Sequence, residues 1–277
     1  MVEAGAVAFV FAAGLLTALA TGLGAVPFFF FDDLSDRWNV VLWGVASGIM
    51  VSASVFGLVL EGLAEGSLVA VVRVGGAALP AGIVPGVLAG VVLVVVSHRI
   101  IEDYEVDPGR YEAADVRKLL LILGILTVHS FPEGVAVGVA FAELGFEGGV
   151  PILGFSVPLL AIFMTVAISI HNVPEGVAIS IPLRAMGVPT RRMVWWAVFS
   201  SLPQPLGAVV AFYFVRIARE FLPFGFGFAA GAMVFLVVSE FIPEALEAGA
   251  DLPGGGRTEL VAGLLAGFGM MAPLAVI

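Results

Sequence analysis

Apolar runs divide this chain into segments long enough to cross a bilayer as helices. A spanning helix needs about 20 mostly apolar residues, and charged residues, glycine or proline interrupt the sequence at about that interval. The first run has no basic segment before it and is too long for a signal peptide, so we expect it to be retained. We expect eight spans, at residues 4–31, 39–62, 78–100, 118–142, 151–183, 192–218, 223–246 and 258–277.

Composition indicates an all-α integral membrane protein with one transmembrane domain over residues 1–277. The chain is 60% hydrophobic and 12% charged, with a mean hydropathy of +1.11, well outside the range of soluble domains. Cysteine is absent, which excludes disulfides and thiolate metal sites within these residues. The sequence has no basic tract that would bind nucleic acid, and no polar segment is long enough for a second domain.

The distribution of basic residues predicts the orientation. If the N-terminus lies outside, the inner side holds Arg37, Arg99, Arg110, Arg117, Lys118, Arg184, Arg191, Arg192 and Arg257. The outer side then holds only Arg73, Arg216 and Arg219. Because inner loops of membrane proteins are enriched in Lys and Arg, we expect both termini to be extracellular in a multi-pass protein of the cell membrane.

Two similar motifs lie within predicted spans, HSFPEG at 129–134 and HNVPEG at 171–176. Helix residues four apart share one face, so each histidine projects beside its glutamate, with the residue after the histidine on their flank. The motifs therefore predict two polar patches, formed by His129, Ser130 and Glu133 and by His171, Asn172 and Glu175.

The two patches are predicted to form one site near the middle of the membrane. The fourth and fifth spans run in opposite directions, and a helix rises about 1.5 Å per residue. Counted from the inner ends, His129 lies roughly 16 Å deep and Glu175 roughly 14 Å deep. Glu133 and His171 lie roughly 22 Å and 20 Å deep. Each histidine is therefore level with the glutamate of the other motif, an arrangement typical of inverted-repeat transporters.

The residue types point to a divalent transition metal. Imidazole nitrogen, carboxylate oxygen and amide oxygen are ligands of Zn²⁺, Fe²⁺ and Mn²⁺. One charge at the bilayer centre costs at least about 2.5–3.5 kcal/mol, so two glutamates require a cation or protons. We therefore expect a secondary transporter for the uptake of a divalent transition-metal ion, Zn²⁺, Fe²⁺, Mn²⁺ or Cd²⁺, with no organic cofactor.

Three further polar residues lie near the inner helix ends. His98, the third histidine of the chain, is followed by Arg99, and we expect it to be solvated at the interface and not to be a ligand. Glu240 and Glu244 also lie near an inner helix end. The pattern slightly favours an ordinary acidic helix end over a role of these residues in metal exit.

At these residues the sequence resembles the ZIP family of divalent-metal transporters, close to its prokaryotic GufA-like and ZupT-like branch. Supporting stretches are GVASGIMVSASVFGLVLEG (44–62), SSLPQPLGA (200–208) and GFAAGAMVFLVVSEFIPEA (227–245). The resemblance implies a 3+2+3 inverted-repeat bundle of eight helices with both termini outside. It also implies alternating access, in which a bundle with the fourth and fifth helices slides against the second and seventh. The sequence does not give the oligomeric state, and a homodimer stays open.

The resemblance also implies a binuclear metal site. One ion would be held by His129, Glu133, His171 and Glu175, and the second by Ser130, Glu133, Asn172, Glu175 and Gln204. The family usually has asparagine where Ser130 stands and often glutamate where Gln204 stands. We therefore expect the first ion to bind tightly and the second site to be weakened.

Two other functions stay open. A cation/calcium exchanger also has inverted repeats, although Ca²⁺ takes oxygen ligands and the paired histidines argue against it. An intramembrane metalloenzyme would need an open metal position and a general base, which His129 or Glu175 could supply. The HExxH pattern of zinc proteases is absent, which makes this reading the weakest.

Overall fold

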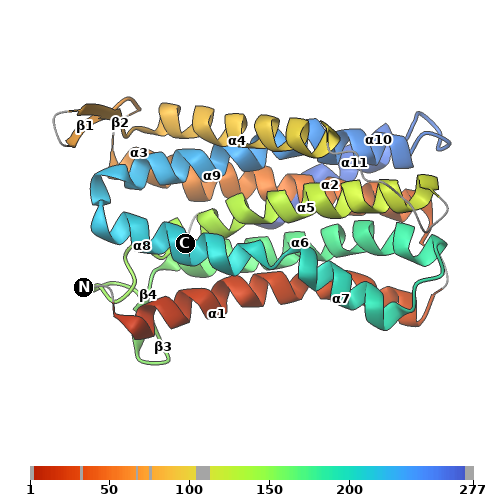
Figure 1. Ribbon diagram of the computed structural model, residues 1–277, viewed down its shortest axis with the longest axis horizontal. Helices are drawn as coiled ribbons and strands as arrows, with labels where there is room; N and C mark the ends of the chain where they lie inside the picture. Colours follow the sequence, from red (N-terminus) through yellow and green to blue (C-terminus); the bar gives the residue numbers. More distant parts are fainter. Residues whose placement is uncertain (1–2, 32–33, 67, 75–76, 104–112, 272–277) are drawn as a thin grey trace.

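The computed structural model describes residues 3–31, 34–66, 68–74, 77–103 and 113–271, and every structural statement below concerns those ranges. Long helices lie side by side, with two short hairpins at one end of the bundle (Figure 1). The first half contains α1 (Ala4–Thr21), η1 (Gly22–Phe29), α2 (Asp36–Ser52), η2 (Ala53–Val59), α3 (Leu60–Glu65), β1 (Val71–Val74), β2 (Ala77–Pro80), α4 (Ile83–Asp103) and α5 (Ala113–Ala140). The second half contains β3 (Val150–Ile152), β4 (Phe155–Val157), α6 (Leu159–Ala185), α7 (Thr190–Ser200), α8 (Pro203–Ile217), η3 (Arg219–Phe221), α9 (Leu222–Leu236), η4 (Val237–Phe241), α10 (Ile242–Ala248) and α11 (Arg257–Met271).

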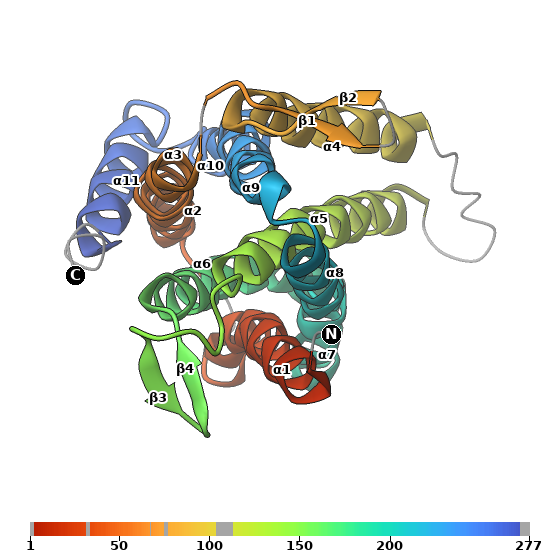
Figure 2. The ribbon, with the colours of Figure 1, turned by 90° about the vertical axis from the view of Figure 1, so that its left-hand side faces the viewer.

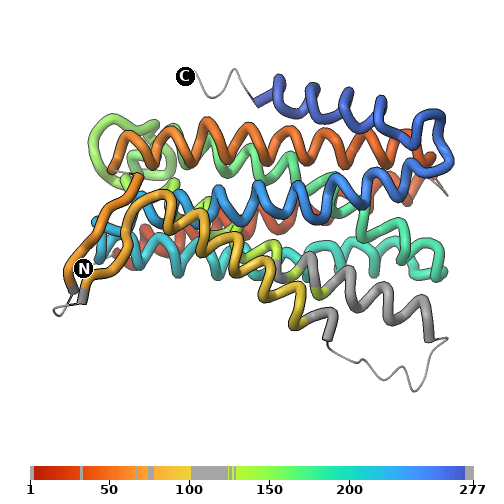
Figure 3. Tube along the Cα trace, turned by 90° about the horizontal axis from the view of Figure 1, so that it is seen from above, coloured from red at the N-terminus to blue at the C-terminus, as the bar shows by residue number. Residues whose placement is uncertain are grey.

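Six helical segments of the described ranges are long and apolar enough to cross a membrane. They are Ala4–Phe29, Asp36–Glu65, Ile83–Ile100, Leu159–Ala185, Thr190–Ile217 and Arg219–Ala248. Helix α5 packs against α6, α8 and α9 in the same bundle, and α11 lies along α2 (Figure 3). The chain is therefore a mostly helical, multi-pass membrane protein.

Two predicted spans begin with hairpins where helix was expected. In the third, Ala77–Pro80 pairs antiparallel with Val71–Val74, and in the fifth, Val150–Ile152 pairs with Phe155–Val157. Helices α4 and α6 begin only after these strands. Valine-rich stretches fit a strand well, and hydropathy alone does not separate a short apolar strand from a helix end.

The sixth predicted span is two helices joined by a turn. Helix α7 ends at Ser200 and α8 begins at Pro203. Pro203 and Pro205 lack a backbone N–H, so an uninterrupted helix through them would lose two hydrogen bonds, whereas proline fits the first turn of a new helix. The break places Gln204 in that first turn, where it faces the other polar side chains of the interior.

The helices form two bundles, seen end on in Figure 2. We call α1, α5, α6, α7 and α8 the ligand bundle, because it carries both motifs. We call α2, η2, α3, α4, α9, η4, α10 and α11 the support bundle. The most extensive helix contacts lie within bundles: α2 with α11, α4 with α9, and α5 with α8.

Glycines let backbones approach closely within each bundle. A methyl group on Gly48 of α2 would overlap the carbonyl oxygen of Leu264 in α11, and one on Gly134 of α5 would overlap that of Gln204 in α8. Small residues at such contacts are the usual means of tight helix packing in membranes. Between the bundles, by contrast, the described glycines meet side chains, as Gly225 meets Val139.

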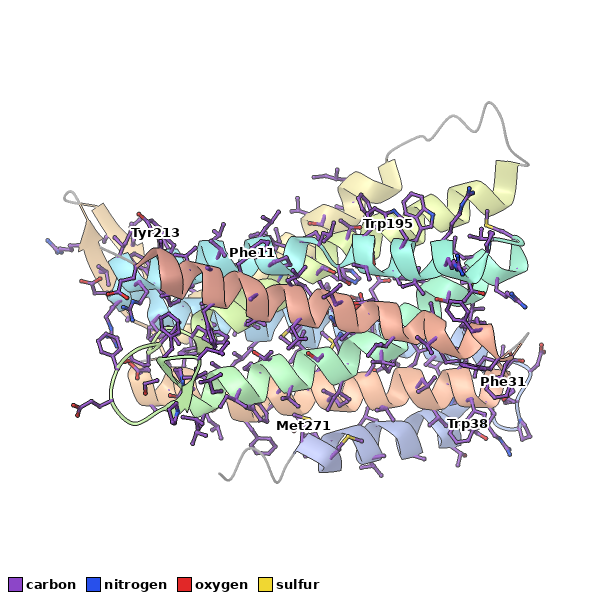
Figure 4. All side chains as sticks on the ribbon, turned by 90° about the horizontal axis from the view of Figure 1, so that it is seen from below. Phe11, Phe31, Trp38, Trp195, Tyr213 and Met271 are labelled. Carbon is purple, nitrogen blue, oxygen red and sulfur yellow. The ribbon has the colours of Figure 1, made fainter. Side chains whose placement is uncertain are left out.

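Large apolar side chains cover the outside of the molecule (Figure 4). Phe11, Trp195 and Tyr213 point outward and are 41%, 61% and 51% exposed. Phe31 and Trp38 lie together at one end. Such a surface suits contact with lipid, and aromatic rings near helix ends suit the membrane interface.

Candidate metal centre

Helices α5 and α6 bring Glu133, His171 and Glu175 together in the interior. One ligand atom from each lies within 4.8 Å of the others, and the Nε2 atom of His171 lies 3.1 Å from the Oε1 atom of Glu133. All three side chains are at most 1% exposed. Glu133 and His171 are thus level with each other, as the depth count predicts for antiparallel spans.

Several buried polar atoms at this point have no hydrogen-bond partner among the described residues. They are both carboxylate oxygens of Glu175, Nδ1 of His171 and Oδ1 of Asn172. Leaving such a group buried and unpartnered costs about 1–3 kcal/mol, and more if it is charged. A divalent cation bound here would take the unpartnered carboxylate oxygens of Glu175 as ligands, and imidazole with carboxylate suits Zn²⁺ and its neighbours.

His129 lies beside this group and contacts His98. Its Nε2 atom is 3.1 Å from the Nε2 atom of His98, and the Nδ1 atom of His98 is 3.1 Å from the Oε1 atom of Glu240. The expectation that His98 is a solvated interfacial residue is therefore wrong. Helix α4 packs against α5 and α9, which turns His98 inward and leaves its side chain only 14% exposed.

Gln204, Asn172 and Thr17 form a hydrogen-bonded chain that ends at Glu133. Gln204 donates through Nε2 to the Oε2 atom of Glu133 at 2.6 Å. Asn172 donates through Nδ2 to Oε1 of Gln204 at 3.0 Å and to the main-chain carbonyl of Thr17 at 2.7 Å. Ser130 is fully buried in the same region.

Sequence reasoning missed three residues of this region. Thr17 and Thr21 interrupt an apolar run with a spacing of four, which places them on one helix face and could have identified α1 as a contributor. Phe241 stacks on His171, with ring centroids 5.4 Å apart. An apolar residue in an apolar span gives no comparable signal.

Helix α6 connects two acidic cavities on opposite sides of the three ligands. A cavity of about 460 Å³ is lined by α6 residues up to Val166 and by Glu61, Glu143 and Glu147. A second cavity, of about 530 Å³, begins at Ala178 of the same helix. Its acidic residues are Asp36, Glu244, Glu247 and Asp251. His171 and Glu175 thus lie on the stretch of α6 between two spaces that attract cations.

Comparisons with known proteins agree with this arrangement. The family model described as ZIP zinc transporter matches residues 102–275. The zinc transporter GufA of Myxococcus xanthus is 33% identical over 92% of this chain and 93% of its own length. The zinc transporter ZIPB of Bordetella bronchiseptica is 35% identical over 91% of this chain and 75% of its own.

A relative from Arabidopsis thaliana whose name refers to zinc transport is 41% identical over 84% of this chain. This chain spans about a third of that protein, 34% of its length. The family model covers more than half of the chain and the bacterial relatives cover nearly all of it, so the chain belongs to the ZIP zinc transporter family.

Proposed function

We propose that this protein carries divalent transition-metal ions, Zn²⁺ first, into the cell through the site between α5 and α6. The observation that supports this most directly is the course of α6 from one acidic cavity, past His171 and Glu175, to the other. An ion that enters either cavity reaches the ligands within about two helical turns.

His129, Glu133, His171 and Glu175 are the proposed ligands of the transported ion, with the free amide oxygen of Asn172 beside them. The three atoms that already lie within 4.8 Å come from Glu133, His171 and Glu175. His129 is the fourth ligand, and its contact with His98 leads the ion onward to Glu240. The names of the relatives, zinc transporters, favour Zn²⁺ among the divalent ions.

We further propose one domain of eight spans in the cell membrane, with both termini extracellular. Helices α5 and α11 are the two spans beyond the six identified by length and hydropathy. The cavity with Asp36 and Glu244 would then open toward the cytoplasm, and the cavity with Glu61 and Glu143 to the outside. A homodimer is compatible with this arrangement.

The glycine contacts support alternating access by movement of one bundle against the other. Within bundles, most glycines of the long helices face backbone, as Gly48 and Gly134 do, and hold those helices tightly together. Across the interface they face side chains such as Val139, Phe163 and Met164. Side-chain contacts can exchange for one another during sliding, whereas interlocked backbones cannot. The ligand bundle would carry the ion past the support bundle.

The geometry favours transport over the two alternatives. An exchanger for Ca²⁺ would surround its ion with six to eight oxygens, but imidazole nitrogens belong to this cluster. A metalloenzyme needs an organic substrate beside the metal, and the ligands here are at most 1% exposed. Hydrolysis of a peptide or lipid without ion flux would favour the enzyme.

Flux measurements on purified protein in proteoliposomes test the proposal. Uptake of Zn²⁺ should be saturable in the wild type and fall at least a hundredfold in Glu133→Gln and Glu175→Gln. Glu220→Gln makes the same charge change at an exposed residue and should transport normally. Unchanged flux in both site variants, or Ca²⁺ outcompeting Zn²⁺, would refute the proposal.

A further inference from the structure

We infer that Gln204 occupies the place of a second metal ion, that Thr17 of α1 positions it there, and that the site takes one ion. This inference rests on the proposed function of the site. It concerns a residue of α1 that neither motif contains, and it follows from the direction of four hydrogen bonds.

The direction of the chain is set by the main chain of α1. The carbonyl oxygen of Thr17 can only accept a hydrogen bond, so the amide atom of Asn172 that lies 2.7 Å from it is the nitrogen. That nitrogen also lies 3.0 Å from an amide atom of Gln204, which must then be the oxygen. The remaining amide atom of Gln204 is its nitrogen, 2.6 Å from the Oε2 atom of Glu133.

The hydroxyl of Thr17 reinforces the same orientation. Its Oγ1 atom lies 2.6 Å from Oε1 of Gln204 and 2.8 Å from the carbonyl oxygen of Gly14. The hydroxyl has one hydrogen, which these two acceptors share. Oε1 of Gln204 therefore receives hydrogen bonds from both Thr17 and Asn172.

The reversed orientation of Gln204 would face like groups against each other. Its nitrogen would meet the nitrogen of Asn172, and its oxygen would meet the Oε2 atom of Glu133. Both contacts are within 3.0 Å, in an interior where an unpaired polar group is costly. The side chain of Gln204 is thus held as a donor to Glu133.

A donor at this position disfavours a second metal ion on Glu133. The amide nitrogen of Gln204 lies against Oε2 of Glu133 and has no lone pair to offer a metal, so it occupies space beside Oε2 without acting as a ligand. Oε1 of Glu133 lies beside His171 and is the oxygen that faces the first ion. Charge balance also favours a single ion, because the charges of two buried glutamates and one divalent ion sum to zero. A second ion would leave two uncompensated positive charges at the membrane centre.

Metal stoichiometry tests the inference directly. Equilibrium dialysis of the purified protein in nanodiscs against Zn²⁺, and separately Cd²⁺, should give one tightly bound ion per chain. Gln204→Glu removes the donor and adds a carboxylate, and should bind two. Two tight ions in the wild type, or one in Gln204→Glu, would overturn the inference.

The role of Thr17 has a matched control on the same helix. Thr21 is equally buried, and its hydroxyl bonds Ser201 without reaching Glu133. Loss of one hydrogen bond should weaken Zn²⁺ binding about fivefold in Thr17→Val, with no change in Thr21→Val or Thr17→Ser. If the two valine variants lose equal affinity, or lose only thermal stability, Thr17 has no positioning role.

These outcomes separate the inference from the proposed function. A wild-type protein that binds no Zn²⁺ and carries no flux contradicts both. A wild-type protein that transports Zn²⁺ and binds two ions contradicts the inference alone.

Discussion

Phe241 lies face to face with His171, with ring centroids 5.4 Å apart and ring planes inclined by 19°. The two residues belong to different bundles, Phe241 to η4 of the support bundle and His171 to α6 of the ligand bundle. Trp43 packs on Phe241 at 4.8 Å and also lines the 530 Å³ acidic cavity. Trp43 and Phe241 therefore separate His171, a proposed ligand, from this cavity.

Replacing Phe241 by leucine should raise the KM for Zn²⁺ about threefold, because an aromatic pair is worth about 0.5–1.5 kcal/mol beyond its buried area. Concentration-dependent flux in proteoliposomes measures this. Phe268 pairs with Phe56 at 5.6 Å within the support bundle, and Phe268→Leu is the control. An equal effect of both substitutions would mean that packing, not the contact with His171, is responsible.

Replacing His98 by leucine should slow Zn²⁺ transport at least tenfold and leave equilibrium binding of one Zn²⁺ nearly intact. His98 lies beyond His129 and outside the cluster of three ligand atoms, so it acts on release more than on capture. Flux and equilibrium dialysis on the same preparation separate the two effects. Loss of binding in proportion to flux would instead make His98 a ligand of the main site.

A disulfide between the bundles should stop transport. An ideal Cβ on Gly225 lies 3.9 Å from the Cβ of Val139, within the range that a disulfide needs, and the chain has no cysteine to interfere. Oxidised Gly225→Cys/Val139→Cys should lose flux and regain it on reduction.

The control for that disulfide lies inside the support bundle. An ideal Cβ on Gly62 lies 3.1 Å from the Cβ of Phe226, a few tenths of an ångström below the usual disulfide separation, and both residues belong to helices of one bundle that should not move apart. Oxidised Gly62→Cys/Phe226→Cys should transport as well as its reduced form. If the disulfide between the bundles left flux unchanged, sliding of the bundles would be excluded.

Gly48→Ala should destabilise the protein by about 1–3 kcal/mol, the usual result of adding a methyl group to a tightly packed contact. The added methyl group overlaps the backbone of Leu264. Gly269 on α11 has nothing within 4 Å, so Gly269→Ala should be neutral or slightly stabilising because alanine favours helix. Thermal unfolding in one detergent compares the two.

Much of this structure can be predicted from the sequence, for physical reasons that differ between elements. Long apolar runs are required by the bilayer itself, so hydropathy locates the helices. Helical rise is constant, so counting residues pairs Glu133 with His171. The two hairpins were missed because a few apolar residues fit a strand as well as a helix end.

The neighbours of the site were harder to predict, because they depend on which helices touch. His98 turns inward only because α4 packs against α5 and α9. The residue pattern of 78–100 does not indicate which helices pack against this span. Thr17 looked like an ordinary helix threonine that bonds its own backbone, which it also does at Gly14. Its contact with Gln204 spans 187 residues of sequence.

The glycine-lined contact of α2 with α11 has a consequence for biosynthesis. The ribosome completes α2 early and α11 after every other described helix, so the groove at Gly44 and Gly48 faces lipid through most of translation. The ligand bundle, by contrast, is complete once α8 has emerged. Among the described helices, α11 thus completes the support bundle after all helices of the ligand bundle have been made.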